Sequence, residues 1–242
     1  MADSRTLERR DGNPDMTAAI RKRMLQVAFA LLIQAAILFI TAGRLDWVMA
    51  WAYVGMCVAI VIINLLVILP RDPELIAERG QVKDDAKAWD RWLGMIAGAV
   101  SPMIMLIVAG LDERFGWSPK LALAIQLAGL VLVALGYGLV CWAMASNKFF
   151  STFVRIQKER GHTVANTGPY RIVRHPGYVG MLIYSLATPV LLGSLWALIP
   201  AGLTVVAFVV RTALEDRTLQ DELDGYRDYA RQVCYRLLPG VW

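Results

Sequence analysis

Four long apolar runs place most of this chain in a lipid bilayer. They cover about Met24–Ala42, Trp47–Leu69, Leu93–Leu111 and Leu121–Ser146. Each run approaches the ~20 residues that a helix rising ~1.5 Å per residue needs to cross ~30 Å of hydrocarbon. Only 19% of the residues are charged, whereas a soluble domain carries about a quarter. We therefore predict an all-α, polytopic membrane bundle with four long transmembrane helices and no separate soluble domain.

A fifth apolar region, Tyr178–Val210, is too long for one crossing. As one straight helix it would extend to roughly 50 Å, beyond what ordinary tilt accommodates. Gly193-Ser194 near its middle predicts a turn, and Pro189 predicts a bend beside it. We therefore expect a broken helical hairpin, whose two ends return to the same side of the membrane.

The basic residues of the polar segments predict the orientation. The segments after the second and fourth runs carry five and six lysines and arginines, whereas the first and third loops carry one and two. This alternation predicts that the N-terminus, the 147–177 segment and residues 211–242 lie in the cytosol. The first 20 residues lack the apolar stretch of a signal peptide, so we interpret them as a cytosolic tail.

The remaining composition predicts neither a nucleic-acid partner nor a metal site. The formal charge of +5 comes from basic residues that flank the apolar runs, where membrane orientation and anionic lipid explain them. Cys57, Cys141 and Cys234 are far apart and show no metal-ligand spacing. We interpret the cysteines as small buried hydrophobic residues.

The polar segment 147–177 contains both histidines of the chain, His162 and His175. Pro176 follows His175 and suits the first turn of a helix, where its missing N–H has no helical partner. The start of that helix would present free N–H groups and a partial positive charge to an anionic group such as a carboxylate. Alternatively, Arg174 and His175 anchor the helix at the lipid headgroups, and the sequence alone leaves both interpretations open.

A second polar feature, Arg211 with Glu215 and Asp216, stands where the hairpin returns. Arg211 and Glu215 are four residues apart and share a helix face. They would form a surface ion pair contributing at most ~0.5 kcal/mol, or the two acids would hold an ammonium group and ribose hydroxyls. Spacing does not choose between these interpretations.

The last segment predicts a C-terminal amphipathic helix. Tyr226, Tyr229 and Val233 recur at helical spacing and form an apolar stripe. Such a stripe serves for packing, as a lid, or for lying on the membrane surface.

Three strings in the C-terminal part resemble a known family: Gly161-His162-Thr163-Val164, Gly168-Pro169-Tyr170-Arg171 and Arg174-His175-Pro176-Gly177-Tyr178-Val179-Gly180. Together with the broken hairpin, the acidic pair and a closing Tyr-rich helix that ends in Arg-Leu-Leu-Pro, they resemble the isoprenylcysteine carboxyl methyltransferases and the related phospholipid N-methyltransferases. The resemblance covers about residues 147–242, and the preceding helices match only in general hydropathy.

The resemblance implies a pocket for S-adenosylmethionine. By motif position its lining would comprise His162, Val164, Gly168, Tyr170, His175, Tyr178 and Gly180. Glu215 and Asp216 occupy the family's acidic-pair position, which is often two glutamates, so either carboxylate could bond the cofactor. Arg211 would face the acceptor or bridge to Glu215, and Arg211, Glu215 and His175 are the predicted catalytic residues. The chain then divides into the 1–20 tail, the 21–146 membrane helices and a 147–242 catalytic region that includes the hairpin.

The acceptor implied is lipid-like or isoprenoid, and carboxyl O-methylation and amine N-methylation both stay open. It would enter laterally between helices, whereas the cofactor would arrive from the cytosol. A carboxylate acceptor needs no base, and Arg211 could orient it. An amine acceptor would need His175 or Glu215 to remove a proton.

Two rival functions stay open from the sequence. Membrane sterol and enone reductases that use NADPH share this architecture and an RHPNY-type string, but Gly177 stands where their Asn would be, and Met181 where an acid would follow. A non-enzymatic transporter component or structural membrane protein is the other rival. The near-absence of ionisable residues in the first four runs argues against a charged transport path.

Overall fold

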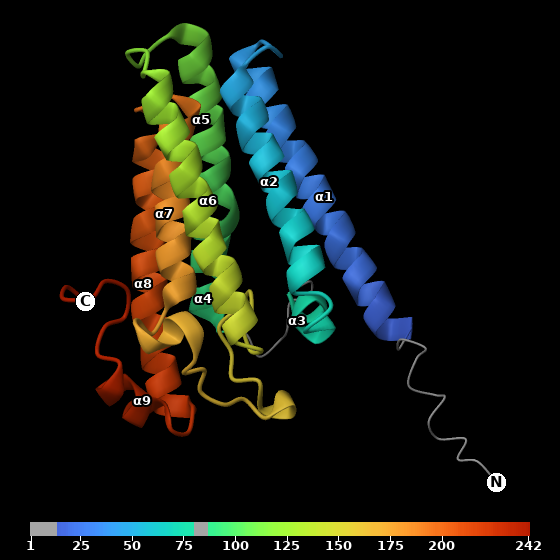
Figure 1. Cartoon of the computed structure of the whole chain (residues 1–242), viewed down its shortest axis with the longest axis vertical. Helices are drawn as coiled ribbons and strands as arrows, with labels where there is room; N and C mark the ends of the chain where they lie inside the picture. The colour runs from blue at the N-terminus through green and yellow to red at the C-terminus, as the bar shows by residue number, and fades with distance from the viewer. Residues whose placement is uncertain (1–13, 80–86) are drawn as a thin grey trace.

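The structure is a computed structural model that describes residues 14–79 and 87–242 (Figure 1). Over these residues it contains helices and loops and no strand. Five helical segments are long and apolar enough to cross a membrane, and α7 is a sixth, shorter apolar helix. The long segments are α1 (Pro14–Ala42), α2 (Val48–Val67), α6 (Leu123–Ser146), α8 (Leu198–Glu222), and a continuous helix in which α4 (Ala88–Met95) passes through a π-helical turn at Ile96–Val100 into α5 (Ser101–Phe115).

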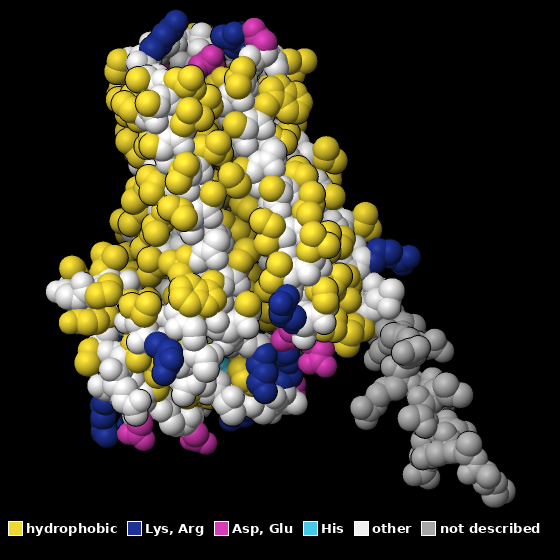
Figure 2. Space-filling view, viewed as in Figure 1, with side chains coloured by type: hydrophobic (Ala, Val, Ile, Leu, Met, Phe, Trp, Pro, Cys, Tyr) yellow, Lys and Arg dark blue, Asp and Glu magenta, His cyan; other side chains and the backbone are white. Residues whose placement is uncertain are grey.

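The predicted all-α bundle is confirmed, and the apolar side chains of its outer surface form a wide band (Figure 2). Leu32, Leu66 and Val131 belong to this band and are more than half exposed. Such large apolar faces suit hydrocarbon and would be unusual in water. The long helices therefore bury few of their residues against one another and present the rest to lipid.

The first helix begins earlier than its apolar run. α1 starts at Pro14, whereas the run was predicted to begin at about Met24. The added turns contain Arg21, Lys22 and Arg23, which a helix tolerates well outside the hydrocarbon. Residues 1–13 of the predicted cytosolic tail lie outside the described residues.

The hairpin turns at the predicted place. α7 (Pro176–Leu192) ends at Gly193, whose φ of +77° is a left-handed conformation that favours glycine. The Ser194 N–H donates to the Pro189 carbonyl at 2.9 Å and closes the turn. α8 then continues past Val210 to Glu222, so the acidic pair lies on the same unbroken helix that forms the second arm.

α6 and α7 pack most closely of all the helices, because glycines let their backbones approach. A Cβ added to Gly180 would lie 2.4 Å from the Gly136 carbonyl oxygen, and one added to Gly136 would lie 2.8 Å from the Gly180 carbonyl oxygen. Small residues at such crossings let membrane helices associate through close van der Waals packing. This contact fixes the start of α7 relative to the end of α6.

A polar layer closes one end of the bundle (Figure 1). It contains the segment between α6 and α7, the short helices α3 (Pro73–Glu78) and α9 (Tyr226–Gln232), and the polar end of α8. The segment between α6 and α7 has little regular structure apart from short 3-10 turns at Lys158–Arg160 and Gly168–Arg171. The alternating directions of the helices therefore bring 147–177 and 211–242 to the same end, as the hairpin predicted.

Candidate functional site

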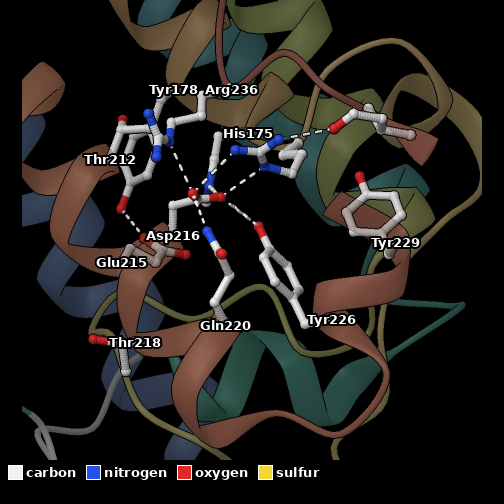
Figure 3. A network of polar contacts seen from close by, with 12 residues as sticks. His175, Tyr178, Thr212, Glu215, Asp216, Thr218, Gln220, Tyr226, Tyr229 and Arg236 are labelled. Atoms are coloured by element: carbon white, nitrogen blue, oxygen red, sulfur yellow. Dashed lines mark hydrogen bonds and ion pairs between the residues drawn. The ribbon is translucent and has the colours of Figure 1, made fainter. Parts of the chain in front are cut away.

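The Asp216 carboxylate is fully buried and joins three separate stretches of the chain (Figure 3). Its Oδ1 accepts from Arg174 Nε at 2.7 Å and from the Tyr226 hydroxyl at 3.0 Å. Its Oδ2 accepts from Arg236 Nε at 2.8 Å. A buried carboxylate with this many donors remains charged, because the donors replace the water that it lost. Asp216 thereby fastens the loop before α7 and the C-terminal segment onto α8.

Backbone hydrogen bonds complete the same junction. The N–H groups of Arg174 and His175 donate to the carbonyls of Tyr235 and Arg236, at 2.9 and 3.0 Å. Arg174 Nη1 also donates to the Val233 carbonyl at 2.8 Å. The His175 side chain is buried, with Nε2 at 3.3 Å from Asp216 Oδ1. The two polar stretches that the sequence singled out therefore meet in one place.

A second buried ion pair connects α4 to α8. Arg211 Nε donates to Asp90 Oδ1 at 2.6 Å, and Arg211 Nη2 donates to Asp90 Oδ2 at 3.0 Å. The same Nη2 donates to the Thr152 carbonyl at 2.7 Å. Asp90 has no exposed surface, and its Oδ2 also accepts from the Val154 N–H at 2.7 Å. The ion pair of Arg211 is therefore with Asp90 and not with Glu215, the partner that helical spacing suggested.

Glu215 has a different environment from its neighbour Asp216. Its carboxylate accepts a short hydrogen bond from the Tyr178 hydroxyl, and the Arg211 guanidinium lies 5.6 Å from the Tyr178 ring centroid. Glu215 is only partly buried and lines a cavity, whereas Asp216 does not line it. Of the two acids, Glu215 is therefore the one whose side chain lines the cavity.

The cavity has a volume of about 680 Å³ and two chemically different ends. One end lies in the polar layer and is lined by His162, Tyr170, His175 and Glu215. The other end reaches between the membrane helices, where Leu31, Met105 and Met181 line it. This volume is in the range of small-molecule sites. The arrangement suits a polar and an apolar group placed side by side.

His162 faces the cavity with a neutral ring. Its Nδ1 accepts from the Gln157 N–H at 3.3 Å, so the neutral ring carries its proton on Nε2. Burial lowers the pKa of His162 to about 4, and the charges of Arg155 and Arg160 add to this shift. The ring also packs against Phe149, with 4.4 Å between ring centroids. At pH 7 His162 is therefore an uncharged hydrogen-bond donor.

Aromatic side chains close the polar end of the cavity. Tyr226 and Tyr229 of α9 are buried and pack with Val164, which also lines the cavity. The Tyr229 hydroxyl donates to the Tyr170 carbonyl at 2.7 Å, and Asn147 Nδ2 donates to the Tyr170 hydroxyl at 3.2 Å. Burial raises the pKa of Tyr170. The predicted stripe therefore packs inward, over the site, on a helix of only seven residues.

Most of the predicted cofactor residues lie together, but three do not line the cavity. His162, Val164, Tyr170, His175, Tyr178 and Glu215 line it, as does Arg211. Gly180 instead contacts α6, and Gly168 (φ +57°) packs so closely that a Cβ there would lie 2.3 Å from Ser146 Oγ. Asp216 is enclosed by its donors. For these three, contact with a cofactor stays a prediction, and the structure supplies each with a packing or ion-pair contact.

Sequence reasoning missed Asp90. It is one acidic residue beside Arg91 at the start of an apolar run, where a headgroup contact is the ordinary interpretation. The separation of 121 positions between Asp90 and Arg211 leaves no local signal of the pairing. An acidic residue at the polar edge of one span, and an arginine at the polar edge of another, are the one hint that the sequence offers.

Comparison with known proteins finds similarity over the segment that carries much of the site. Residues 127–221 match the isoprenylcysteine carboxyl methyltransferase (ICMT) family. The chain is 32% identical to protein-S-isoprenylcysteine O-methyltransferase of Rattus norvegicus over an alignment of 114 residues. This alignment covers 44% of this chain and 38% of the relative. It is also 32% identical to protein-S-isoprenylcysteine O-methyltransferase B of Arabidopsis thaliana over an alignment of 108 residues, which covers 43% of this chain and 55% of that protein's length.

The chain thus matches about half, or less, of the length of these curated relatives. The matched segment begins within α6 and ends within α8, so it contains the loop that carries His162 and His175 as well as Arg211 and Glu215. The predicted resemblance of the C-terminal part of this chain to the isoprenylcysteine carboxyl methyltransferase family is confirmed.

Proposed function

We propose that this protein is an integral membrane methyltransferase that uses S-adenosylmethionine to methylate a lipid-like acceptor. The observation that carries the proposal is the single cavity whose polar end is lined by Glu215 and His162 and whose other end opens among apolar membrane helices. A polar methyl donor and an apolar acceptor need such a site, because each requires a different environment. The family match over the same residues supports the proposal.

The residues at the polar end fit the cofactor. Glu215 offers a carboxylate to an ammonium group or ribose hydroxyls, and His162 offers a neutral donor through Nε2. Tyr170 and Phe149 also line the cavity, and aromatic side chains suit a positively charged sulfur. The cofactor supplies a methyl group that is already activated by its attachment to a sulfonium.

The protein's contribution is then mainly positioning. Holding two reactants in line can lower a barrier by ~7–11 kcal/mol in favourable cases. Asp90 fixes the Arg211 guanidinium, and Tyr178 fixes the Glu215 carboxylate, so both side chains are preorganised. Tyr226 and Tyr229 cover the polar end and exclude water. Asp216 acts by holding these pieces together and not by touching the cofactor.

Direction and access follow from the same arrangement. The basic residues of the polar layer support a cytosolic position for the site, so the cofactor would enter from the cytosol. The acceptor would enter from the bilayer, next to Leu31 and Met181. Prenylated carboxylates are the acceptors that the relatives' names indicate, and we propose an acceptor of that apolar class here.

A Glu215→Gln substitution tests the assignment of the polar end. We expect the affinity for S-adenosylhomocysteine to fall about tenfold or more, because a charged hydrogen-bond acceptor is lost. The measurement is calorimetric titration of the protein in nanodiscs, together with transfer of a labelled methyl group into membrane lipids. NADPH serves as a competing ligand for the wild-type protein.

The matched control is Glu222→Gln, on the same helix, where the carboxylate is exposed and pairs with Lys87. It should retain wild-type affinity. Wild-type protein that binds NADPH and not S-adenosylhomocysteine would contradict the methyltransferase assignment. Unchanged affinity in Glu215→Gln would contradict the placement of the cofactor.

A further inference from the structure

Arg79, directly after α3, brings a guanidinium without a complete set of partners to the cavity. It lines the cavity, and its Nη1 is buried with no hydrogen-bond partner among the residues that the structure describes. The guanidinium lies over the Phe150 ring, 5.3 Å from its centroid. A buried donor left unsatisfied costs ~1–3 kcal/mol, and more when it belongs to a charged group. Such a group favours any ligand that supplies an acceptor.

The charges around Arg79 indicate that an anionic ligand would satisfy its unpaired Nη1 donor best. Burial lowers the pKa of Arg79, and the positive charges of Arg23 and Arg211 lower it further, against an opposing effect of Tyr137. Arg23, on α1, lines the same cavity. Among the described residues that shift the Arg79 pKa, none is a carboxylate. The side chains of Arg23 and Arg79 therefore line one cavity together.

Other arginines in or beside the site have carboxylate partners, as the buried Arg155 has in Glu159. Asp90 neutralises Arg211, and Asp216 neutralises Arg174 and Arg236. Arg211, which the sequence suggested for orienting a carboxylate acceptor, thus already has a bidentate carboxylate partner. Within 14–79 and 87–242, the structure provides no such carboxylate for Arg79.

Arg79 lies next to the site already described. Thr152 Oγ1 donates to the Arg79 carbonyl at 3.4 Å, and the Thr152 carbonyl accepts from Arg211. Phe150, beneath the Arg79 guanidinium, packs against Gly177 at the start of α7, where an added Cβ would lie 2.7 Å from the ring. The short loop segment that contains Phe150 and Thr152 therefore contacts Arg79, Arg211 and the start of α7.

We propose that Arg79 binds the carboxylate of the methyl acceptor and positions it for methyl transfer. The inference rests on the proposed methyltransferase function. A carboxylate oxygen of the acceptor forms the new bond to the methyl carbon, while the carbon–sulfur bond breaks and its electron pair stays on sulfur. A neutral ester and a neutral thioether result, and no proton has to leave. Arg79 lies outside the segment matched by the family, so the comparison assigns it no role.

An acceptor anchored in this way is released by its own reaction. The ester that forms carries no negative charge, so the guanidinium holds the product less strongly than the substrate. A charge-assisted bond to a guanidinium is about twice as strong as a neutral one. Arg79 therefore selects the acidic acceptor and favours departure of the ester into the bilayer.

The test measures acceptor binding without turnover. Full-length protein in nanodiscs of phosphatidylcholine is titrated with N-acetyl-S-farnesylcysteine or palmitate, and with the carboxamide of each. The variants are Arg79→Gln, Arg79→Lys and the control Arg71→Gln, whose exposed side chain donates to the Val67 carbonyl outside the cavity. Comparing variant with wild type for each probe cancels differences in membrane partitioning.

We expect Arg79→Gln to weaken binding of at least one carboxylate probe about 10- to 100-fold, with an equal rise in KM. Binding of the amides and of S-adenosylhomocysteine should stay within about twofold. Arg79→Lys should restore part of the carboxylate affinity, because its ammonium keeps the charge but loses the bidentate geometry. Arg71→Gln should behave as wild type.

Three results would overturn the inference. Wild-type protein that binds S-adenosylhomocysteine but neither carboxylate probe lacks the proposed anchor. Equal affinity for the carboxylate probe and for its carboxamide would show that the protein does not recognise the negative charge of the acceptor. Loss of S-adenosylhomocysteine affinity in Arg79→Gln assigns the residue to the cofactor instead. Failure of the wild type to bind S-adenosylhomocysteine contradicts the proposed function itself and is thereby distinguished from failure of the anchor.

Discussion

At the scale of single residues, the two neighbouring acids on α8 have opposite surroundings. Asp216 faces Arg174, Arg236 and Tyr226 and is closed off from the cavity. Glu215 faces the cavity and is held by Tyr178. Successive residues on a helix point about 100° apart, which is sufficient to place one side chain in the protein interior and the next toward a ligand. One acid is thus available for binding and the other for holding the site together.

Asp216→Asn should destabilise the protein strongly. The substitution leaves two guanidiniums facing a neutral amide, and breaking a buried ion pair costs ~3–5 kcal/mol. The melting temperature in detergent should drop clearly, and protease should cut the segment around Arg236 sooner. Asp221→Asn is the matched control, because Asp221 is exposed on the same helix. Equal melting temperatures of the two variants would show that the hydrogen bonds and ion pairs of Asp216 contribute nothing to the stability of the protein.

The sequence predicted residues that stand together in motifs and missed those that act alone. His162, Tyr170, His175 and Tyr178 occur in contiguous strings, so the amino-acid order itself indicates that they belong together. The partners of Asp216 also lie in these strings, but the strings do not say that Arg174 and Arg236 meet one carboxylate, because the three residues are far apart in the sequence. A family's motif also does not say which way a side chain faces, which is why the sequence left open whether Glu215 or Asp216 bonds the cofactor.

At the scale of elements, glycines determine how α6 meets α7. Gly136 and Gly180 each face the other's backbone, and Gly129 faces Leu191 further along. A family motif drew attention to Gly180, but it does not tell whether the missing side chain makes room for a ligand or for a helix. Local signals were more informative elsewhere: Gly193 marked the turn of the hairpin, because a left-handed residue ends a helix wherever it lies.

Gly136→Ala should weaken the α6–α7 contact, because the new methyl group would lie 2.8 Å from the Gly180 carbonyl oxygen. We expect a loss of about 1–3 kcal/mol, typical of overpacking, measured as earlier thermal unfolding. Gly138→Ala, two residues further on the same helix, is the control. Nothing lies within 4 Å of the added Cβ there, so stability should be kept or should rise slightly. A larger loss of stability in Gly138→Ala than in Gly136→Ala would contradict a close contact between α6 and α7 at Gly136.

At the scale of the whole molecule, the helices alternate in direction and gather the polar segments at one end. Cys234 lies at that end and is exposed, whereas Cys57 is buried. Lys120 is exposed in the loop between α5 and α6, at the other end. The sequence predicted this plan well, because apolar runs and basic loops are properties that the bilayer itself selects. It could not predict how far α1 extends beyond its apolar run.

A membrane-impermeant maleimide should therefore modify Cys234 only from the cytosolic face. The measurement compares inverted with right-side-out vesicles, with Cys234→Ser as the unlabelled background. In that background Lys120→Cys should be modified only from the opposite face. Labelling of Cys234 from the outer face would reverse the orientation that the basic loops predict.

The buried junction at Asp216 also has a consequence for how the protein is made. Arg236 is synthesised after the membrane spans that the structure describes, yet it is one of the cations that bond the Asp216 carboxylate. All the spans can therefore be inserted and paired in the bilayer before the polar end of the cavity is closed. During synthesis, insertion of the described spans would thus precede formation of the Asp216 junction, and a chain interrupted before Arg236 would lack that junction.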